Sequence, residues 1–340
     1  MINFKDIKDV HVELTTLCNA RCPMCVRNGH GYPHNFGYPE ASMSLEQVKQ
    51  IFYPEFVKQL DTMSICGNYG DFVANQEALE IIDYFGTTNP QLRMIISTNG
   101  SARNIEFWQN LAKYNTQIYF CIDGLEDTHS IYRLDTSFSK IIKNATAFIN
   151  AGGRAIWKMI MFKHNKHQID QCSQLSKELG FADFNLTDHG RSKTTVFNKQ
   201  GEYQYLIGPG EESKFNNVQD VIRWHERLEF EYPEPKQELN CYSKNSKSIY
   251  VAANGEVYPC CYLGFYPKTF ENGIIFSKRN KQLANLLEGK ENNALLAGLE
   301  ASIEWFNEIE RSWSIKEYRS GRLLGCDEHC GSNKYINRVL

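Results

Sequence analysis

Three cysteines with the spacing CxxxCxxC, at Cys18, Cys22 and Cys25, are the residues of this chain best suited to chemistry. They directly follow the strand-like run VHVELT, in a loop that contains Asn and Pro. Three thiolates this close could hold three corners of an iron–sulfur cube and leave the fourth iron open. An open metal position can bind and activate a substrate, whereas a site closed by four protein ligands only stores charge or supports structure.

Two plainer interpretations of the same cysteines stay open. They could be buried apolar thiols, because cysteine is among the most buried residue types. They could also be part of a structural zinc site, although no fourth ligand lies near them in the sequence to close a tetrahedron. Their position in a polar loop directly after a strand favours the iron–sulfur interpretation.

The elements that must position these cysteines form a repeated pattern. From residue 10 to residue 186, short β-rich runs alternate with helical periodicity, as expected for βα units with a parallel sheet. Six strands are predicted, at Val10 to Thr15, Thr62 to Cys66, Leu92 to Thr98, Gln117 to Ile122, Ala155 to Phe162 and Asp183 to Leu186. Helices are predicted over 44–52, 75–85, 139–150 and 169–180, with Ser44 and Gln47 as a capping box and Gly180 as a terminator.

Six βα units fall short of a closed barrel of eight, so the predicted fold is α/β, a partial (β/α)6 barrel with chemistry at the carboxyl ends of its strands. Residues 195–217 lose the periodicity and contain Gly-Pro-Gly, which is typical of a connection or lid. A smaller α+β region follows, with a hairpin whose Asn254-Gly255 predicts a type I′ turn. We therefore expect a core over 1–195, a connection or lid over 196–235 and a C-terminal domain over 236–340.

The stretch Cys18-Asn-Ala-Arg-Cys22-Pro-Met-Cys25 resembles the signature of the radical S-adenosylmethionine (SAM) superfamily. In that family a 4Fe-4S cluster with this spacing holds the amino and carboxylate groups of SAM on its open iron. The resemblance implies a partial-barrel core and reductive cleavage of SAM to methionine and a 5′-deoxyadenosyl radical, which abstracts hydrogen from C–H bonds. It also implies a reducing electron donor such as flavodoxin or ferredoxin. It indicates a reaction type and not a substrate.

Motifs at the strand ends also resemble segments of this family. Tyr69-Gly70-Asp71-Phe72 follows the second strand and looks like a variant of the family's Gly-Gly-Glu-Pro segment, which implies that Gly70 and Asp71 meet the SAM amino group. The departures are Tyr for the first Gly, Asp for Glu and Phe for Pro. Read alone, the segment is an ordinary glycine-rich turn.

The third strand closes with Ser-Thr-Asn99-Gly, and the fourth with Cys121-Ile-Asp123-Gly followed by His129 and Arg133. These segments resemble the family's Ser-x-Asp-Gly stretch with its His and Arg, which implies that Asn99 and Asp123 face the ribose and Arg133 the methionine carboxylate. Cys121 replaces the usual Ser. A guanidinium can hold a carboxylate through two hydrogen bonds. The alternative is a solvated surface arginine paired with Glu126 or Asp127.

Further cysteines lie near the end of the chain. The spacing of Cys241, Gly255 and Cys260, with thirteen residues between the first two and four between the last two, resembles the opening of SPASM and twitch domains, which carry auxiliary iron–sulfur clusters. Cys326 and Cys330 would complete four ligands. The full SPASM pattern has more cysteines than this region offers, so the resemblance implies a twitch-like domain with one second, auxiliary 4Fe-4S cluster. Zinc is the competing occupant of four thiolates. The adjacent Cys261 leaves open which of the pair is the ligand.

An auxiliary cluster ligated entirely by protein has no open iron, so its expected task is to accept an electron. The resemblance then implies a radical SAM oxidoreductase that performs a net oxidation of a small polar metabolite. About ten residues precede the first strand, so no leader-recognition domain is expected there, but a peptide-modifying maturase stays open as the second candidate. A noncatalytic zinc or iron–sulfur binding module is the alternative from another class. No acid or base has a spacing that identifies it as catalytic.

Composition excludes several other functions. The 340-residue chain has a formal net charge of −3 and no long run of Lys or Arg, which argues against nucleic acid as a partner. No segment reaches the roughly 18 apolar residues that span a bilayer, and no signal peptide is recognisable, so no membrane partner and a cytoplasmic location are expected. Eleven cysteines, an odd number, suit metal ligation under reducing conditions better than a disulfide framework.

Overall fold

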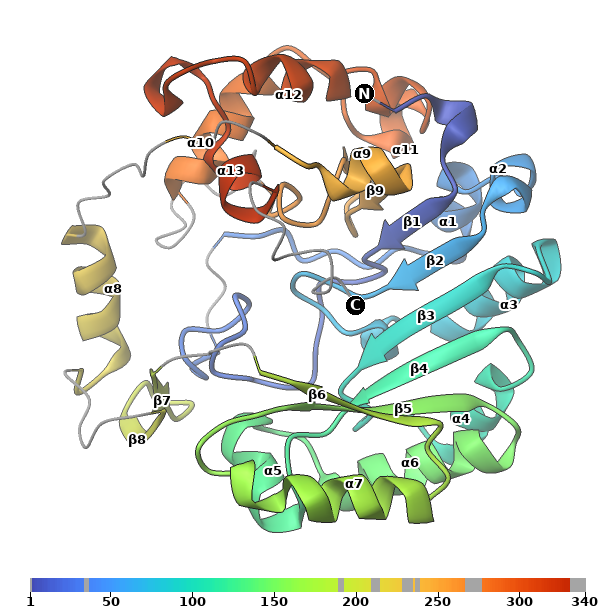
Figure 1. The fold of residues 1–340 in the computed structure, drawn as a ribbon, viewed down its shortest axis with the longest axis vertical. Coiled ribbons are helices and arrows are strands. Elements are labelled where there is room, and N and C mark those ends of the chain that lie inside the picture. The colour runs from blue at the N-terminus through green and yellow to red at the C-terminus, as the bar shows by residue number, and fades with distance from the viewer. Residues whose placement is uncertain are drawn as a thin grey trace.

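The fold is known from a computed structural model, shown in Figure 1. It describes residues 2–33, 37–188, 193–208, 215–227, 235, 239–266 and 277–330. Within these residues no helix is both long enough and apolar enough to cross a membrane.

One eight-stranded sheet forms the body of the molecule, with the strand order β10-β9-β1-β2-β3-β4-β5-β6. All neighbouring strands are parallel except β10, which runs antiparallel to β9. The strands are β1 (Asp9–Val12), β2 (Thr62–Ile65), β3 (Arg93–Thr98), β4 (Thr116–Cys121), β5 (Arg154–Ile160), β6 (Asp183–Thr187), β9 (Ser248–Val251) and β10 (Val257–Tyr258). The six predicted core strands are thus confirmed as β1 to β6.

Helices cover the outer face of this curved sheet (Figure 1). They are α1 (Leu45–Ile51), α2 (Pro54–Gln59), α3 (Ala78–Thr88), α4 (Ile105–Leu111), α5 (Glu126–Tyr132), α6 (Phe138–Asn150) and α7 (Ile169–Glu178). The expected capping box opens α1, since Ser44 and Gln47 each accept a hydrogen bond from the other's backbone N–H. The alternation of β and α elements is that of a partial (β/α)6 barrel, which confirms the predicted fold class.

Alternation along each strand divides its side chains between two environments. In β4, Ile118 and Phe120 are fully buried against the helices, whereas Gln117, Tyr119 and Cys121 are half-buried on the concave inner face. This inner face is the one on which a substrate can be enclosed, because the helices block the other.

The C-terminal region continues the sheet of the barrel. Strand β9 pairs in parallel with β1, and the two regions share one continuous apolar core, in which Val12 of β1 lies in the same cluster as Trp305 and Phe306. Five further helices gather over this end of the sheet (Figure 1). They are α9 (Tyr242–Ser246), α10 (Ser277–Leu286), α11 (Ala294–Ala297), α12 (Phe306–Ser312) and α13 (Leu324–Cys330). The domain bounds stay a prediction.

The β9–β10 hairpin is confirmed, but its predicted type I′ turn is wrong. A type I′ turn needs positive φ at both central residues, and of the pair only Gly255 has it, at +88°. The chain reverses instead through the loop 252–256, which is closed by the hydrogen bond from Gly255 N–H to the carbonyl of Ala252 (2.8 Å). A longer loop needs only one left-handed residue.

Residues 194–207 were not expected to contain strands, but they form a two-stranded hairpin of β7 (Thr194–Phe197) and β8 (Tyr203–Ile207), followed by α8 (Val218–Arg227). Val196 and Ile207 pack in the same apolar cluster as Cys22. The backbone N–H of Phe197 donates to the carbonyl of His30 at 3.0 Å. This hairpin therefore lies against the loop that carries the first three cysteines.

Buried asparagines fasten the loops at the strand ends. Asn144 of α6, 2% exposed, donates from Nδ2 to the carbonyls of Gly100 (2.8 Å) and Ala102 (3.1 Å) in the loop after β3. In the loop after β5, Asn165 instead accepts at its Oδ1 from the N–H of Phe162 (2.7 Å). These side chains satisfy backbone groups that have no partner in a strand or helix.

We expect Asn144→Ala to lower the free energy of unfolding by about 1–3 kcal/mol, because two carbonyls of the loop after β3 lose their donor. The measurement is urea unfolding of the reconstituted protein. Asn150→Ala, at the exposed end of the same helix, is the control and should change stability by less than about 0.5 kcal/mol. Equal effects of the two substitutions would contradict this role for Asn144.

Candidate functional site

The loop after β1 brings the first three cysteines together. The N–H of Cys25 donates to the carbonyl of Cys22 at 3.0 Å, which makes a tight turn between the second and third cysteines. Cys18 accepts at its sulfur from the backbone N–H of Ala20 at 3.4 Å. Cys22 and Cys25 both act electrostatically on Cys18, and Cys25 acts on Cys22, which shows that the three are neighbours.

The surroundings of these sulfurs fit iron–sulfur ligation. Two side-chain donors reach them, Asn99 Nδ2 to Cys18 (3.7 Å) and Arg133 Nη1 to Cys22 (3.7 Å). Burial raises the pKa of Cys22 to about 11 and that of Cys18 further, so both are protonated at neutral pH unless a metal takes the proton's place. Donors aimed at ligating sulfur are a usual means of stabilising such a centre.

The loop after β2 packs directly against the cysteine loop. A Cβ on Gly70 would lie 1.8 Å from the carbonyl oxygen of Thr15, so only glycine fits at this crossing. Beside it, the N–H of Asp71 donates to the carbonyl of Leu17 at 2.9 Å. Gly70 and Asp71 thus lie next to the cysteine loop, as the sequence led us to expect.

The carboxylate of Asp71 is hydrogen bonded to other groups of the protein. Its buried carboxylate accepts from Thr98 Oγ1 (2.8 Å) and from the backbone N–H (2.6 Å) and Nδ2 (2.8 Å) of Asn99. Burial raises the pKa of Asp71, and these hydrogen bonds oppose the rise. Asp71 therefore orients Asn99, whose amide also faces Asn19 of the cysteine loop (3.0 Å).

Asp123 and Arg133 form a buried pair. Arg133 Nε lies 2.6 Å from Asp123 Oδ2, and Asp123 Oδ1 accepts from the N–H of Ile160 at 2.6 Å. The side chain of Arg133 is only 14% exposed and pairs with Asp123, so the alternative of a solvated arginine bound to Glu126 or Asp127 is wrong. The pair positions the guanidinium beside Cys22.

Helix α5, which follows the loop after β4, contains His129. It is buried, and burial lowers its pKa to about 4. Its Nδ1 accepts from the N–H of Asp123 (3.1 Å), and Nε2 lies 3.0 Å from Thr136 Oγ1. Both ring nitrogens are therefore used within the protein, and His129 supports Asp123.

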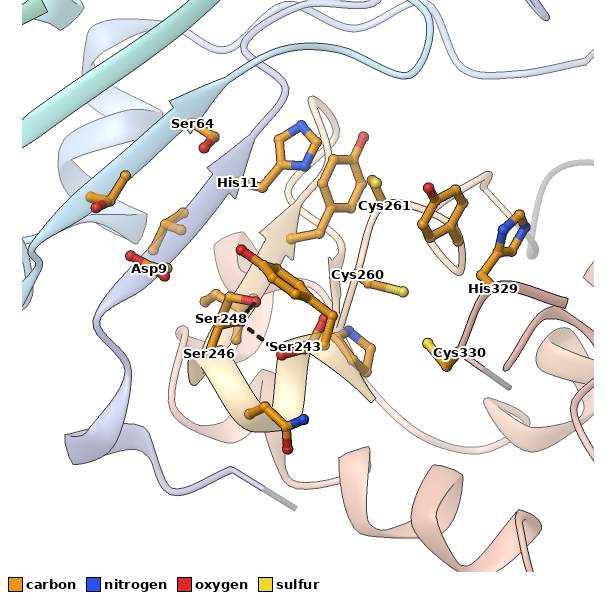
Figure 2. A pocket seen from close by; sticks show the side chains of 18 of the residues that line it. Asp9, His11, Ser64, Ser243, Ser246, Ser248, Cys260, Cys261, His329 and Cys330 are labelled. Carbon is orange, nitrogen blue, oxygen red and sulfur yellow. Dashed lines mark hydrogen bonds between the residues drawn. The ribbon is translucent and has the colours of Figure 1, made fainter. Parts of the chain in front are cut away.

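The four C-terminal cysteines form a second group. Cys241 precedes α9, Cys260 follows β10, and Cys326 and Cys330 lie four residues apart in α13, on one face of the helix. Cys330 hydrogen bonds to Cys241 and raises its pKa, and the charges of Cys241 and Cys260 both act on Cys326. Figure 2 shows Cys260 and Cys330 facing one space.

The adjacent Cys261 points elsewhere (Figure 2). Its electrostatic neighbours are Cys66, at the end of β2, and Glu13, whereas Cys260 interacts with Cys241 and Cys326. Within the described residues, no three Cys, His, Asp or Glu side chains are gathered tightly enough to hold a single metal ion. A four-iron cluster takes one cysteine per iron, so its ligands need not converge on one point as zinc ligands must.

A cavity of about 380 Å³ lies on the inner face of the sheet, beside the second cysteine group. Inward side chains of β1 and β2, including His11 and Ser64, form one wall, and α9 and β9 form another (Figure 2). Cys260 and Cys330 border it. A cavity of this size holds a small organic molecule.

A buried glutamate ties the two cysteine groups together. Glu13 is 0% exposed, and its Oε1 accepts from the backbone N–H groups of Tyr69 (2.7 Å) and Gly70 (3.1 Å). Its Oε2 accepts from the hydroxyls of Tyr250 (3.0 Å) and Tyr266 (2.8 Å) in the C-terminal region. Burial raises the pKa of Glu13, and the four donors oppose the rise.

Sequence reasoning missed Glu13 and His11. Both alternate with Val10 and Val12 in the run VHVELT, so they share the face opposite the apolar one. That alternation was the available signal, because a polar residue at every second position of a central strand must face a cavity or a buried partner.

Two family models match the chain. The model of the radical SAM superfamily matches residues 12–174, and that of the SPASM iron–sulfur cluster-binding domain matches residues 241–312. A search of curated proteins finds no significant match.

The fold is shared with solved structures of SuiB, and further solved structures are similar to the chain. Streptococcus suis SuiB bound to S-adenosylmethionine is 14% identical with a TM-score of 0.52, over 79% of this chain and 63% of that one. SuiB bound to its precursor peptide SuiA has a TM-score of 0.51 at 14% identity, over 87% of this chain and 70% of that one. Native anSMEcpe with bound AdoMet is 16% identical with a TM-score of 0.47, over 74% of each chain. At these identities the similarity shows the fold alone.

We expect Cys260→Ser to lose the iron and sulfide of one cluster, because Cys260 belongs to the second cysteine group. The neighbouring Cys261→Ser is the matched control and should keep both clusters. Iron and acid-labile sulfide per chain, measured after anaerobic reconstitution, distinguish the two. The opposite result would make Cys261 the ligand.

We expect Glu13→Gln to lower the free energy of unfolding by about 1–3 kcal/mol, because an amide cannot accept from all four donors. Urea unfolding measures the change. Glu46→Gln, at an exposed position of α1, is the control and should change stability by less than about 0.5 kcal/mol. An unchanged stability in Glu13→Gln would show that the four hydrogen bonds do not hold the region together.

Proposed function

Because the chain belongs to the radical SAM superfamily and carries a SPASM-type iron–sulfur domain, we propose that it oxidises a small polar metabolite. The family's cofactors are SAM and 4Fe-4S clusters, which together supply a radical that takes a hydrogen atom from a C–H bond. The observation that carries the proposal is the cavity of about 380 Å³ bordered by Cys260 and Cys330.

Cys18, Cys22 and Cys25 would hold the first cluster and leave one iron for SAM. The residues proposed to bind SAM, or to position the groups that bind it, are Gly70, Asp71, Asn99, Asp123 and Arg133. Asp71 acts through Asn99, because its oxygens already accept from Thr98 and Asn99. Asp123 likewise holds Arg133 in a buried pair. The pairing fixes the guanidinium, which suits it to bind the methionine carboxylate of SAM.

Cys241, Cys260, Cys326 and Cys330 would hold the auxiliary cluster with no open iron. Cys260 and Cys330 border the cavity, so a cluster that they hold would fill its cysteine side and adjoin a substrate in the remainder, which would give one electron a short path out. Loss of a hydrogen atom, a proton and this electron converts a secondary alcohol to a ketone. The reaction is thus proposed to be a dehydrogenation.

The volume of the cavity favours a small molecule over a peptide. Peptide modification is the second candidate, since SuiB, which shares the fold, is known in complex with its precursor peptide SuiA. The chain spans 63% of the length of SuiB, and that complex is a property of SuiB.

We propose the cytoplasm as the compartment, because all eleven cysteines are free thiols and the seven proposed ligands must stay reduced to bind iron. The low-potential electron is proposed to come from a flavodoxin or ferredoxin. A general base for the substrate proton stays unassigned.

We expect the protein, reconstituted anaerobically and given a strong reductant, to produce 5′-deoxyadenosine from SAM. The variant with Cys18, Cys22 and Cys25 all changed to Ala should lose one cluster and all 5′-deoxyadenosine, because the open iron is gone. Chromatography of the product and iron analysis measure both effects. Continued production by this variant would refute the assignment of the first cluster.

Changing Cys326 and Cys330 to Ala is the matched control. This variant should lose the auxiliary cluster and keep the first, so SAM cleavage without substrate should persist. A protein that binds zinc and yields no 5′-deoxyadenosine would instead be a noncatalytic metal-binding module.

A further inference from the structure

His11 lines the cavity from the inner face of β1. In the sheet it lies opposite Ser64 of β2 on one side and Tyr250 of β9 on the other. Its ring packs edge-on against the ring of Tyr250, with 4.9 Å between centroids. Figure 2 shows it projecting from β1 toward the side of the cavity where Cys260 and Cys261 lie.

One hydrogen bond determines which ring nitrogen carries the proton. His11 Nε2 lies 2.6 Å from the backbone carbonyl oxygen of Cys66. A carbonyl oxygen can only accept, so Nε2 must be the donor. Burial lowers the pKa of His11 to about 4, so the ring is neutral at pH 7 and carries no second proton.

The other nitrogen, Nδ1, is therefore an acceptor only. No donor to it is found among the described residues, and the half-buried ring keeps part of its surface open to the cavity. A lone pair in such a place favours a ligand that brings an O–H or N–H group, and it repels carboxylate or phosphate oxygens.

The remaining charges around the cavity agree with this preference. Of the described residues that line it, Arg93 is the only lysine or arginine, and Asp9 lies near Arg93 and offsets its charge. Most other polar groups in the lining are neutral hydroxyls and amides, such as Ser64, Ser243 and Asn240. The lining also contains the imidazole of His329, which stacks on Tyr262, but among the described residues it has no second lysine or arginine beside Arg93 with which to clamp an anion.

We propose that His11 is a specificity residue whose Nδ1 accepts a hydrogen bond from a hydroxyl or amine of a small, non-anionic substrate in this cavity. The inference rests on the proposed function for the reaction and names the class of substrate. A ring that resists protonation is suited to orienting the hydroxyl and not to carrying its proton away. The bond to Cys66 fixes the ring plane, so the lone pair has one direction in which to accept.

The test is calorimetric titration of the reconstituted, SAM-loaded protein with three probes of similar size. Two are non-anionic, myo-inositol and 2-deoxystreptamine, and the third, quinate, carries a carboxylate. We expect at least one non-anionic probe to bind, and quinate to bind at least about tenfold more weakly, the effect of one misplaced hydrogen bond.

Two variants separate recognition from support of the fold. His11→Gln keeps an N–H that can reach the carbonyl of Cys66 but has no acceptor at the position of Nδ1, so probe affinity should fall about tenfold. His11→Asn keeps an oxygen near the position of Nδ1 and loses the bond to Cys66, so it should retain more affinity than His11→Gln. Iron content and circular dichroism check that both variants are folded and loaded.

A second readout comes from nitrogen NMR of protein labelled with ¹⁵N-histidine, with both clusters oxidised. The His11 signals, identified by their absence in His11→Gln, should show a protonated Nε2 and an unprotonated Nδ1, and the Nδ1 shift should move when the bound probe is added. A protonated Nδ1 would overturn the proposal.

Three binding results would also overturn it: His11→Gln binding as tightly as the unmodified protein, quinate binding as tightly as the other probes, or neither non-anionic probe binding. The proposed function fails separately, by the absence of 5′-deoxyadenosine, because SAM cleavage without substrate does not involve His11.

Discussion

The buried carboxylate of Glu13 is the interaction on which the arrangement of both cysteine groups depends. It lies on the central strand β1 and accepts two backbone N–H groups from the loop after β2 and two tyrosine hydroxyls from the C-terminal region. A carboxylate in so apolar a place is stable only with all its acceptor positions filled. One side chain consequently links the loop after β2, which packs against the first three cysteines, to the C-terminal region.

Much of the site follows from residue types and spacing. The CxxxCxxC loop, the six core strands and the glycine before Asp71 are local features, since each depends on a short stretch of sequence. The choice between Cys260 and Cys261 is not local. It depends on where the chain turns after β10, so the sequence leaves both open and the fold points them in different directions.

The distinction between local and nonlocal features also explains where else the structure differs from what the sequence predicts. Arg133 has Glu126 and Asp127 close by in the sequence, yet its partner is Asp123, because Arg133 lies at the end of α5, from where its guanidinium reaches back to the end of β4. The hairpin of β7 and β8 has a weak strand signal of its own and is stabilised by packing against the loop of Cys22. Glu13 and His11 gain their roles from partners more than fifty residues away, on β2 or in the C-terminal region.

The pairing of β9 with β1 has a consequence for how the chain is made. Until residues 248–251 leave the ribosome, one edge of β1 has no strand beside it, although β2 to β6 can already assemble on its other side. An unpaired strand edge invites pairing with other chains. The C-terminal region covers this edge of β1 once it is made, and truncation before β9 would leave the edge open and remove the tyrosines that donate to Glu13.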